Sequence, residues 1–317
     1  MPLLQPARTP TMYFIGVTTG SSSIMRVFPR WAEHLGIDAR ITGIDLPLDA
    51  DPAAYREVVS FIKNDPLSLG ALVTTHKLNL FKASRDLFDG AGEDTRLLDE
   101  VSSISKRGAE LWGHAMDPLT SGLSLLAIVG EDAWRGGEHL VLLGAGGSSL
   151  ALTLFLHRRK VAGESVPDRV VVTNRREHRL DEMRQIHAAI GFSIPIDYIL
   201  APDPQVNDAA VSQAPPGSVI VNATGLGKDR PGSPLTDAVR FPARAIAWDF
   251  NYRGDLVFLD QARSQAAPAG LGIEDGWVYF LHGWTRVISE VFHIDIPTAG
   301  PEFDKLGEIA RGATEKG

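Results

Sequence analysis

The sequence contains no cysteine, which excludes disulfides, thiolate catalysis and cysteine-based zinc sites. It also has no excess of positive charge, because 31 Lys and Arg stand against 39 Asp and Glu, a formal net charge of −8. Nucleic-acid backbones are bound mainly by clustered Lys and Arg, so we expect no nucleic-acid partner. The nine histidines show no spacing typical of metal ligands, and we expect no metal site.

Long apolar runs are absent as well. No stretch approaches the roughly 20 apolar residues that a membrane span requires. Residues 1–11 are interrupted by Pro2, Pro6 and Pro10 and contain no run of signal-peptide length. We therefore expect a cytoplasmic protein without a membrane partner. With 317 residues, of which 44% are hydrophobic and 22% charged, the chain is expected to form two ordinary globular domains.

The first third of the chain alternates short β-branched runs with amphipathic stretches, a pattern that predicts repeated strand and helix units. The expected strands are 12–17, 39–46 and 69–73, and the expected helices are 24–35 and 52–62. The strand at 69–73 leads into Thr74-Thr75-His76-Lys77. In open α/β sheets, ligand-contacting residues gather at the carboxyl ends of strands, so this segment is a candidate site.

Further along, Asp117 precedes an apolar helical pattern and is expected to be a helix N-cap. Strand-like runs at 139–143, 169–173, 196–200, 218–221 and 245–248 then alternate with helical segments. This alternation predicts a parallel, doubly wound sheet. A last helix near 278–292 and a polar tail are expected to return to the first domain.

A glycine-rich segment, Gly144-Ala-Gly-Gly-Ser-Ser149, lies directly between an expected strand and an expected helix. Gly144 permits a tight turn, and Gly146 lets the backbone approach a pyrophosphate that faces the positive helix N-terminus. The third glycine of the GxGxxG pattern is replaced by Ser149. The segment predicts a dinucleotide site, the alternative being a glycine-rich turn without a ligand.

The next strand ends in Asn174-Arg175-Arg176, where an NAD-selective site usually has an acidic residue. Guanidinium groups suit a 2′-phosphate, so the segment favours NADP over NAD. The alternative is that both arginines simply begin a solvated helix.

With these pieces in order, the chain resembles the shikimate dehydrogenase family over nearly its whole length. In the first part of the chain, segments occupy the places of the family's motifs in order: the Ser-x-Ser loop at 16–23, the end of NVTxPxK at 71–77, a segment similar to AVNT at 100–103 and one similar to NTD at 115–117. The later motifs match more closely: GAGG at 144–147, NR at 174–175, NAT-x-G at 222–227, an acidic-aromatic motif at 249–252 and a segment similar to DG…QG at 275–283.

The resemblance implies an α/β protein with an N-terminal α/β catalytic domain and a Rossmann-type, doubly wound NADP-binding domain. Residues 1–120, completed by 277–317, would bind the substrate, and residues 121–276 would bind NADP, with NAD less expected. Lys77 and Asp117 fall on the family's catalytic pair. The substrate-binding residues implied are Ser21, Ser22, Ser23, Thr75, Ser102, Tyr252 and His282. The cofactor-binding residues implied are Gly144, Ala145, Gly146, Gly147, Ser148, Asn174, Arg175, Arg176, Asn222, Ala223, Thr224, Gly225 and Gly276.

Removal of a hydride from an alcohol carbon requires an acid/base group within hydrogen-bond reach of the hydroxyl. Desolvation would have to lower the pKa of Lys77, whereas the carboxylate of Asp117 acts in the opposite direction. Which of the two accepts the proton stays open, and they can titrate as one unit. Some of the residues implied to bind substrate also have purely structural alternatives. The serines and Thr75 can be turn formers or helix caps, and His282 can be a hydrogen-bonded structural histidine.

Several family positions differ here. In the NVTxPxK motif, the family's Asn, Thr and Pro fall on Ala71, Val73 and Thr75. The Asn of the AVNT motif falls on Ser102, and the two serines of the Ser-x-Ser loop fall on Ser22 and Ile24. The Gln of the last motif falls on Gly283 or His282. Sites built to bond a hydroxyl discriminate strongly when that partner changes. We therefore expect an NADP-dependent oxidoreductase, monomeric or homodimeric, that oxidises a ring hydroxyl of a shikimate-like cyclic polyol or hydroxy acid. The alternatives are an authentic shikimate or quinate dehydrogenase of the shikimate pathway and an inactive nucleotide-binding sensor.

Overall fold

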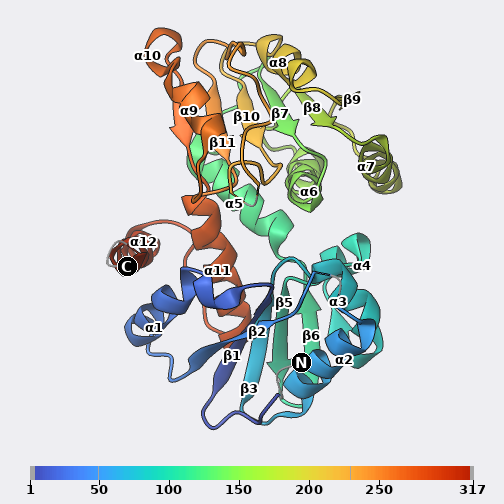
Figure 1. The fold of residues 1–317 in the computed structure, drawn as a ribbon, viewed down its shortest axis with the longest axis vertical. Helices are drawn as coiled ribbons and strands as arrows, with labels where there is room; N and C mark the ends of the chain where they lie inside the picture. Colours follow the sequence, from blue (N-terminus) through green and yellow to red (C-terminus); the bar gives the residue numbers. More distant parts are fainter. Residues whose placement is uncertain (1–3, 49, 229, 315–317) are drawn as a thin grey trace. The chain divides into compact units, whose positions relative to one another are not determined.

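The computed structural model describes residues 4–48, 50–228 and 230–314, and the chain divides into two compact units (Figure 1). The first unit comprises Met1–Met116 and Leu281–Gly317, and the second comprises Asp117–Phe280. Each unit contains one six-stranded sheet. The α/β fold class expected from the alternating sequence pattern is thereby confirmed.

The sheet of the first unit has the strand order β2-β1-β3-β5-β6-β4. Strands β1, β2 and β3 are parallel, whereas β5 runs antiparallel to β3 and β6. The strands are β1 (Thr11–Gly16), β2 (Arg40–Asp45), β3 (Ser68–Val73), β4 (Gly90–Ala91), β5 (Ser103–Arg107) and β6 (Glu110–His114). The helices are α1 (Ile24–Leu35), α2 (Pro52–Asn64), α3 (Lys77–Ser84), α4 (Glu93–Leu98), α11 (Trp277–Phe292), which begins in the second unit, and α12 (Pro301–Thr314), with 3-10 turns at Thr19–Ser21 and Arg85–Leu87.

Both faces of this sheet are covered, because alternate strand residues point to opposite sides. Tyr13 and Ile15 pack into a core with α2 and α3. On the other face, Phe14 contacts Trp284 of α11, with ring centroids 5.0 Å apart. Trp31 of α1 donates to Leu306 O of α12 at 2.8 Å, which ties these two helices together.

The C-terminal segment expected to be a polar tail is the helix α12. Its buried residues are Phe303, Leu306, Gly307, Ala310 and Ala313. These recur every three or four positions between charged residues, so the segment is amphipathic and gains its stability from packing on α1.

Glu290, in the later part of α11, interacts with β5 and β6 of the sheet in the first unit. Its Oε1 accepts from Ser105 Oγ at 3.1 Å and from Arg107 at 3.0 Å, and His114 Nε2 lies 3.0 Å away. His114, together with the arginine and the serine, lowers the pKa of Glu290 to about 2. A folded-state pKa below the usual 4.5 means that this stabilisation is present above about pH 4.5 and is lost as the pH falls toward 2.

Glu290→Gln is therefore expected to lower the free energy of unfolding at pH 7 by about 1–2 kcal/mol, allowing for screening of this partly exposed group. The deficit should shrink as the pH is lowered, which urea denaturation at a series of pH values measures. Glu302→Gln, which removes the more exposed carboxylate paired with His34, is the control and should change stability little. A pH-independent deficit in Glu290→Gln would contradict this assignment.

The sheet of the second unit is entirely parallel and has the order β12-β11-β10-β7-β8-β9. Its strands are β7 (His139–Leu143), β8 (Arg169–Asn174), β9 (Ile196–Leu200), β10 (Val219–Asn222), β11 (Ile246–Asp249) and β12 (Gly272–Glu274). Its helices are α5 (Asp117–Val129), α6 (Gly147–Val161), α7 (Glu177–Ile190), α8 (Pro204–Ser212), α9 (Val257–Arg263) and α10 (Ala266–Ala269). The predicted doubly wound parallel sheet is confirmed.

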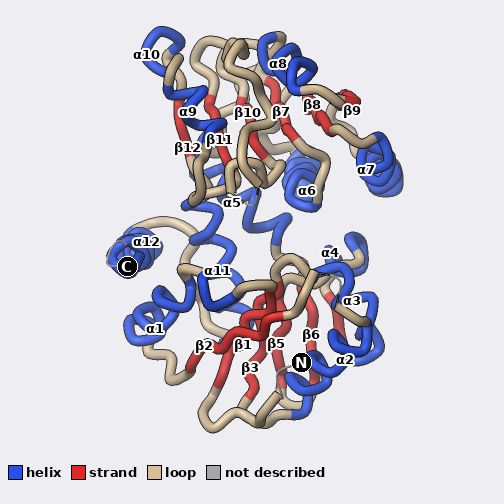
Figure 2. The backbone as a smooth tube through the Cα atoms, in the orientation of Figure 1, coloured by secondary structure: helices blue, strands red, loops and turns tan. Residues whose placement is uncertain are grey.

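Helices cover both faces of this second sheet as well (Figure 2). Val141 and Leu143 of β7 join a core with α8 and α9, whereas Leu140 and Leu142 join a core with α5, α6 and α7. Strands buried on both faces account for the continuous apolar run at 139–143. Over the residues that the structure describes, no helix combines the length and the apolar character needed to cross a membrane.

Candidate active site

In the first unit, the loops after β1, β2 and β3 lie side by side. The three strands are parallel, so their carboxyl ends fall on one edge of the sheet. Thr74 N donates to Ile15 O at 3.0 Å, and Leu46 N donates to Gly16 O at 2.8 Å. The polar segment that ends in Lys77 therefore lies where ligand sites form in open sheets.

Two hydrogen bonds connect the backbone around Lys77 with the residue before Asp117. Val101 N donates to Lys77 O at 3.3 Å, and Met116 N donates to the hydroxyl oxygen of Ser102 at 2.7 Å. Ser102 is only 3% exposed, so its hydroxyl serves the backbone of this segment. Asp117, expected as a helix N-cap, is instead the first residue of α5.

The three serines after β1 form a turn and the start of α1. Ser21 is exposed, and its Oγ donates to Thr18 O at 2.9 Å, which agrees with the turn-forming alternative. Ser23 is buried and precedes α1. Thr75 is exposed and has a φ of 58°, an unusual value for a β-branched residue.

His282 is buried in the first unit and faces α12. Its ring stacks on Phe303 with centroids 4.4 Å apart, and it is 1% exposed. Within the described ranges, neither ring nitrogen has a hydrogen-bond partner, so the expected hydrogen-bonded structural histidine is not observed. Burial, with a smaller contribution from Arg286, lowers the pKa of His282 to about 4.

His282→Phe is expected to raise the free energy of unfolding by about 1–3 kcal/mol, because it keeps the stacked ring and removes two unbonded nitrogens. The gain should be larger at acidic pH, since the wild-type ring loses stability as the pH falls from 6.5 toward 4. His187→Phe is the matched control: both nitrogens of that buried ring are bonded, to Thr153 and Tyr198, so stability should fall. A well-folded His282→Phe variant that loses activity would instead make His282 a substrate ligand.

In the second unit, the glycine-rich segment lies where the strand order reverses, between β7 and β10. Open α/β sheets bind nucleotides at such switch points. Gly144 has a φ of 113°, and an added Cβ would lie 3.0 Å from Ala223 O, so a side chain is disfavoured both by the backbone conformation and by this close contact. Gly146 precedes α6, and a Cβ there would meet nothing within 4 Å. The backbone at the helix N-terminus therefore faces open space in which an anion can approach.

Ser149, in place of the third glycine, has a structural explanation. It is fully buried, and its Oγ donates to Gly144 O at 2.6 Å. The hydroxyl closes the turn between β7 and α6 from inside, so the incomplete glycine pattern still forms a tight strand-to-helix turn.

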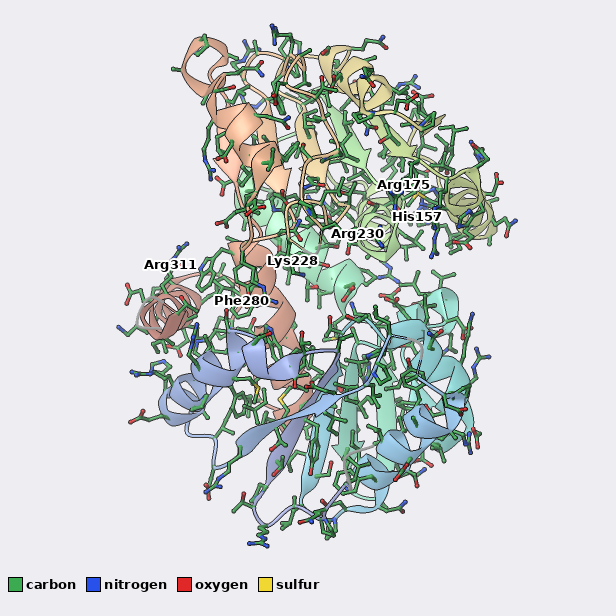
Figure 3. All side chains as sticks on the ribbon, viewed as in Figure 1. His157, Arg175, Lys228, Arg230, Phe280 and Arg311 are labelled. Carbon is green, nitrogen blue, oxygen red and sulfur yellow. The ribbon has the colours of Figure 1, made fainter. Side chains whose placement is uncertain are left out.

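Asn174 connects this turn with the arginine pair. Ala145 N donates to Asn174 Oδ1 at 3.4 Å, and Asn174 Nδ2 donates to Arg176 O at 2.9 Å. Arg175 and Arg176 are exposed and precede α7, and the described residues supply no ion pair for either. Figure 3 labels Arg175 here, together with Lys228 and Arg230 on the segment after β10. Cations therefore follow two strands on opposite sides of β7.

A buried amide and carboxylate network holds the carboxyl ends of β10 and β11. Asn222 Nδ2 donates to Asp249 Oδ2 at 2.8 Å, and Asn251 N and Nδ2 donate to Asp249 Oδ1 at 2.8 and 2.7 Å. Thr224 Oγ1 donates to Asn222 Oδ1 at 2.7 Å. Burial raises the pKa of Asp249 to about 6, although the hydrogen bonds oppose it. Asn222 thus positions the loop through Ala223 and Gly225 with a side chain that has no exposed surface.

Aromatic rings gather beside this network. Tyr252 packs against Trp277 and Phe280, with centroids 5.8 and 4.9 Å away. Gly276 allows this arrangement, because a Cβ there would lie 2.2 Å from Phe250 O.

Sequence reasoning missed two residues, Asp249 in the second unit and His76 in the first. Asp249 belonged to a recognised motif, but only the structure shows its carboxylate bonded to Asn222. His76 lies in the polar segment Thr74–Lys77, but the sequence pattern assigned no role to it. Only its position directly after an expected strand could have marked His76 as functional. A histidine in such a loop can be structural or catalytic, and only its contacts decide which.

Sequence comparison finds related proteins, although no family model matches the chain. The chain is 28% identical over 221 residues to a shikimate dehydrogenase (NADP(+)) from Symbiobacterium thermophilum, covering 69% of this chain and 68% of that protein. It is 26% identical to a protein of the same name from Streptococcus pneumoniae, over 58% of this chain. The match spans 62% of that second relative, so these sequence relationships cover less than the full proteins.

Solved structures with the same fold match almost the whole chain. The shikimate dehydrogenase from Aquifex aeolicus has a TM-score of 0.72 at 17% identity, covering 98% of this chain and 99% of that one. A quinate dehydrogenase from Corynebacterium glutamicum, in complex with NAD, has a TM-score of 0.72 at 16% identity, covering 96% and 99%. A 5-ketofructose reductase from Gluconobacter has a TM-score of 0.68 at 15% identity, covering 96% and 99%. At these identities, the likeness establishes the fold.

A mixed α/β unit together with a doubly wound unit that carries a glycine-rich loop defines a two-unit α/β protein with a Rossmann-type fold in its second unit. More narrowly, the chain has a sequence likeness to shikimate dehydrogenases at low identity and shares the fold of their solved structures.

Proposed function

We propose that this protein is an NADP-dependent oxidoreductase of the shikimate dehydrogenase type, which reversibly oxidises a ring hydroxyl of a shikimate-like cyclic polyol or hydroxy acid. The observation that supports it best is a pair of hydrogen bonds on neighbouring residues: Val101 N donates to Lys77 O, and the hydroxyl of Ser102 accepts from the backbone N of Met116, the residue before Asp117. The family resemblance puts a catalytic pair at these two positions.

The second unit suits NADP. Gly144, Gly146 and the start of α6 offer backbone amides to a pyrophosphate, and the exposed Arg175 and Arg176 suit a 2′-phosphate. The loop through Ala223 and Thr224, held by Asn222, borders the same turn. When bound, NADP supplies the hydride acceptor.

The chain's own acid/base chemistry falls to Lys77 and Asp117. One of the two side chains accepts the hydroxyl proton of the substrate, and the other orients the accepting side chain.

The positions at which this chain differs from the family support a ligand other than shikimate. Ala71 and Val73, where the family has Asn and Thr, belong to the buried core of the first unit. Gly283 supplies no side chain, and a Cβ there would meet nothing within 4 Å. Fewer polar groups and more space favour a ring with a different substituent pattern, since unmatched polar groups are strongly discriminated against.

The test is NADP reduction, followed by absorbance, with shikimate, quinate, cyclitols and amino-cyclitols, and NADPH oxidation with 5-ketofructose. Turnover of a cyclic polyol or hydroxy acid other than shikimate supports the proposal. Turnover of shikimate or quinate alone would make the protein an authentic shikimate or quinate dehydrogenase. NADP binding, measured by calorimetry, without turnover of any compound would favour an inactive sensor.

A further inference from the structure

The segment before Lys77 contains a strained turn. Thr75 has a φ of 58°, and His76 N donates to Thr74 O at 2.5 Å, which closes a three-residue turn around Thr75. A β-branched residue in this region of φ is destabilised by about 1–3 kcal/mol and persists only where the surroundings hold it. The side chain of Thr75 is exposed, so the restraint must come from elsewhere.

The buried imidazole of His76 supplies that restraint. The residue is 1% exposed, its Nε2 lies 3.0 Å from Leu46 O, and its Nδ1 lies 3.0 Å from Tyr55 Oη. A carbonyl can only accept, so Nε2 carries the proton and donates to Leu46 O. Nδ1 therefore accepts from the hydroxyl of Tyr55. One ring thus bonds to the loop after β2 and to α2.

The same residue is the N-cap position of α3. Leu80 N donates to His76 O at 2.8 Å, and the helix begins at Lys77. Lys77 consequently leaves the backbone one residue after the anchored ring, while its own carbonyl accepts from Val101. Movement of the imidazole would be transmitted directly to the Cα of Lys77.

We propose that His76 is a positioning residue for Lys77: its buried ring, bonded between Tyr55 and Leu46, holds the strained turn that sets the direction of the lysine side chain. It acts through Lys77 and does not touch the reacting atoms. The catalytic consequence depends on the proposed function, whereas the structural one does not. A misplaced acid/base group lowers kcat much more than it changes cofactor binding.

Tyr55→Phe tests this with minimal change, since it removes only the hydroxyl that donates to Nδ1. We expect kcat to fall about tenfold with KM for NADP unchanged. We also expect a changed rate of acylation of Lys77, measured by mass spectrometry relative to Lys82 on the same helix. Tyr198→Phe is the matched control, because it removes a hydroxyl 2.6 Å from Nδ1 of another buried histidine, His187, in the second unit. It should alter neither quantity.

Unchanged acylation of Lys77 in Tyr55→Phe overturns the positioning role, whether or not the wild-type protein is active. Changed acylation with unchanged kcat overturns its catalytic importance. If the wild-type protein oxidises no compound, the proposed function fails, while acylation still decides the positioning.

His76 itself is tested by His76→Asn, which retains an acceptor toward Tyr55, beside His76→Leu, which retains none. Partial rescue of Lys77 acylation and of kcat by asparagine supports the assignment. Equal values for both variants, with equal thermal stability, oppose it.

Discussion

Replacing Lys77 with alanine is expected to lower kcat by roughly 10²–10⁴-fold, the usual contribution of a positioned acid/base group. Binding of NADP should be unaffected, because the glycine loop and the arginine pair belong to the other unit. Steady-state kinetics with the best substrate of the panel, together with calorimetric titration of NADP, measures both quantities.

Lys82→Ala is the control for this result, since it removes an exposed lysine from the same helix. A small primary amine added to Lys77→Ala should restore part of the rate if the missing group acts as an acid or base. Normal turnover by Lys77→Ala would refute the catalytic assignment. An equal loss in Lys82→Ala would point to damage of α3.

The double substitution Arg175→Ala and Arg176→Ala is expected to raise KM for NADP by about 100-fold and to leave KM for NAD nearly unchanged. Each charge-assisted hydrogen bond to a phosphate contributes about 1.5–3 kcal/mol, and only NADP carries the 2′-phosphate. Parallel kinetics with the two cofactors gives the change in selectivity.

Arg169→Ala removes the same charge from the opposite end of β8, where Arg169 pairs with Asp197. It should not change cofactor selectivity. Equal effects of the double substitution on NAD and NADP, or tighter binding of NAD by the wild-type protein, would mean that the arginines only begin a solvated helix.

Local patterns in the sequence were sufficient for most of the second unit. The strands expected at 139–143 and 196–200 coincide with β7 and β9. Leu140 to Leu143 of β7 are all buried, so the apolar run by itself marks that strand. β9 lies at the edge of the sheet, and its residues are partly or fully exposed. By contrast, α12 was missed because its periodic apolar residues are separated by charges and glycines, and its stability comes from α1.

The candidate site was predictable only in part. The residues around Gly144 and Arg175 follow strand ends and could be recognised from spacing. The role of Ser102 could not be predicted, because it depends on a hydrogen bond to a residue 14 positions away. The anchoring of His76 depends on Leu46 and Tyr55, 30 and 21 positions away.

The sequence by itself determined the α/β class, the doubly wound sheet and the glycine-rich turn, since each follows from periodicity or from backbone freedom within a few neighbouring residues. The tertiary structure alone decided which polar side chains form hydrogen bonds inside the protein. Ser102, Asn222 and His76 proved to be bonded inside the protein, whereas His282 proved to be buried without a partner. The reason is that hydrogen bonding and burial depend on residues far apart in the chain, which only packing brings together.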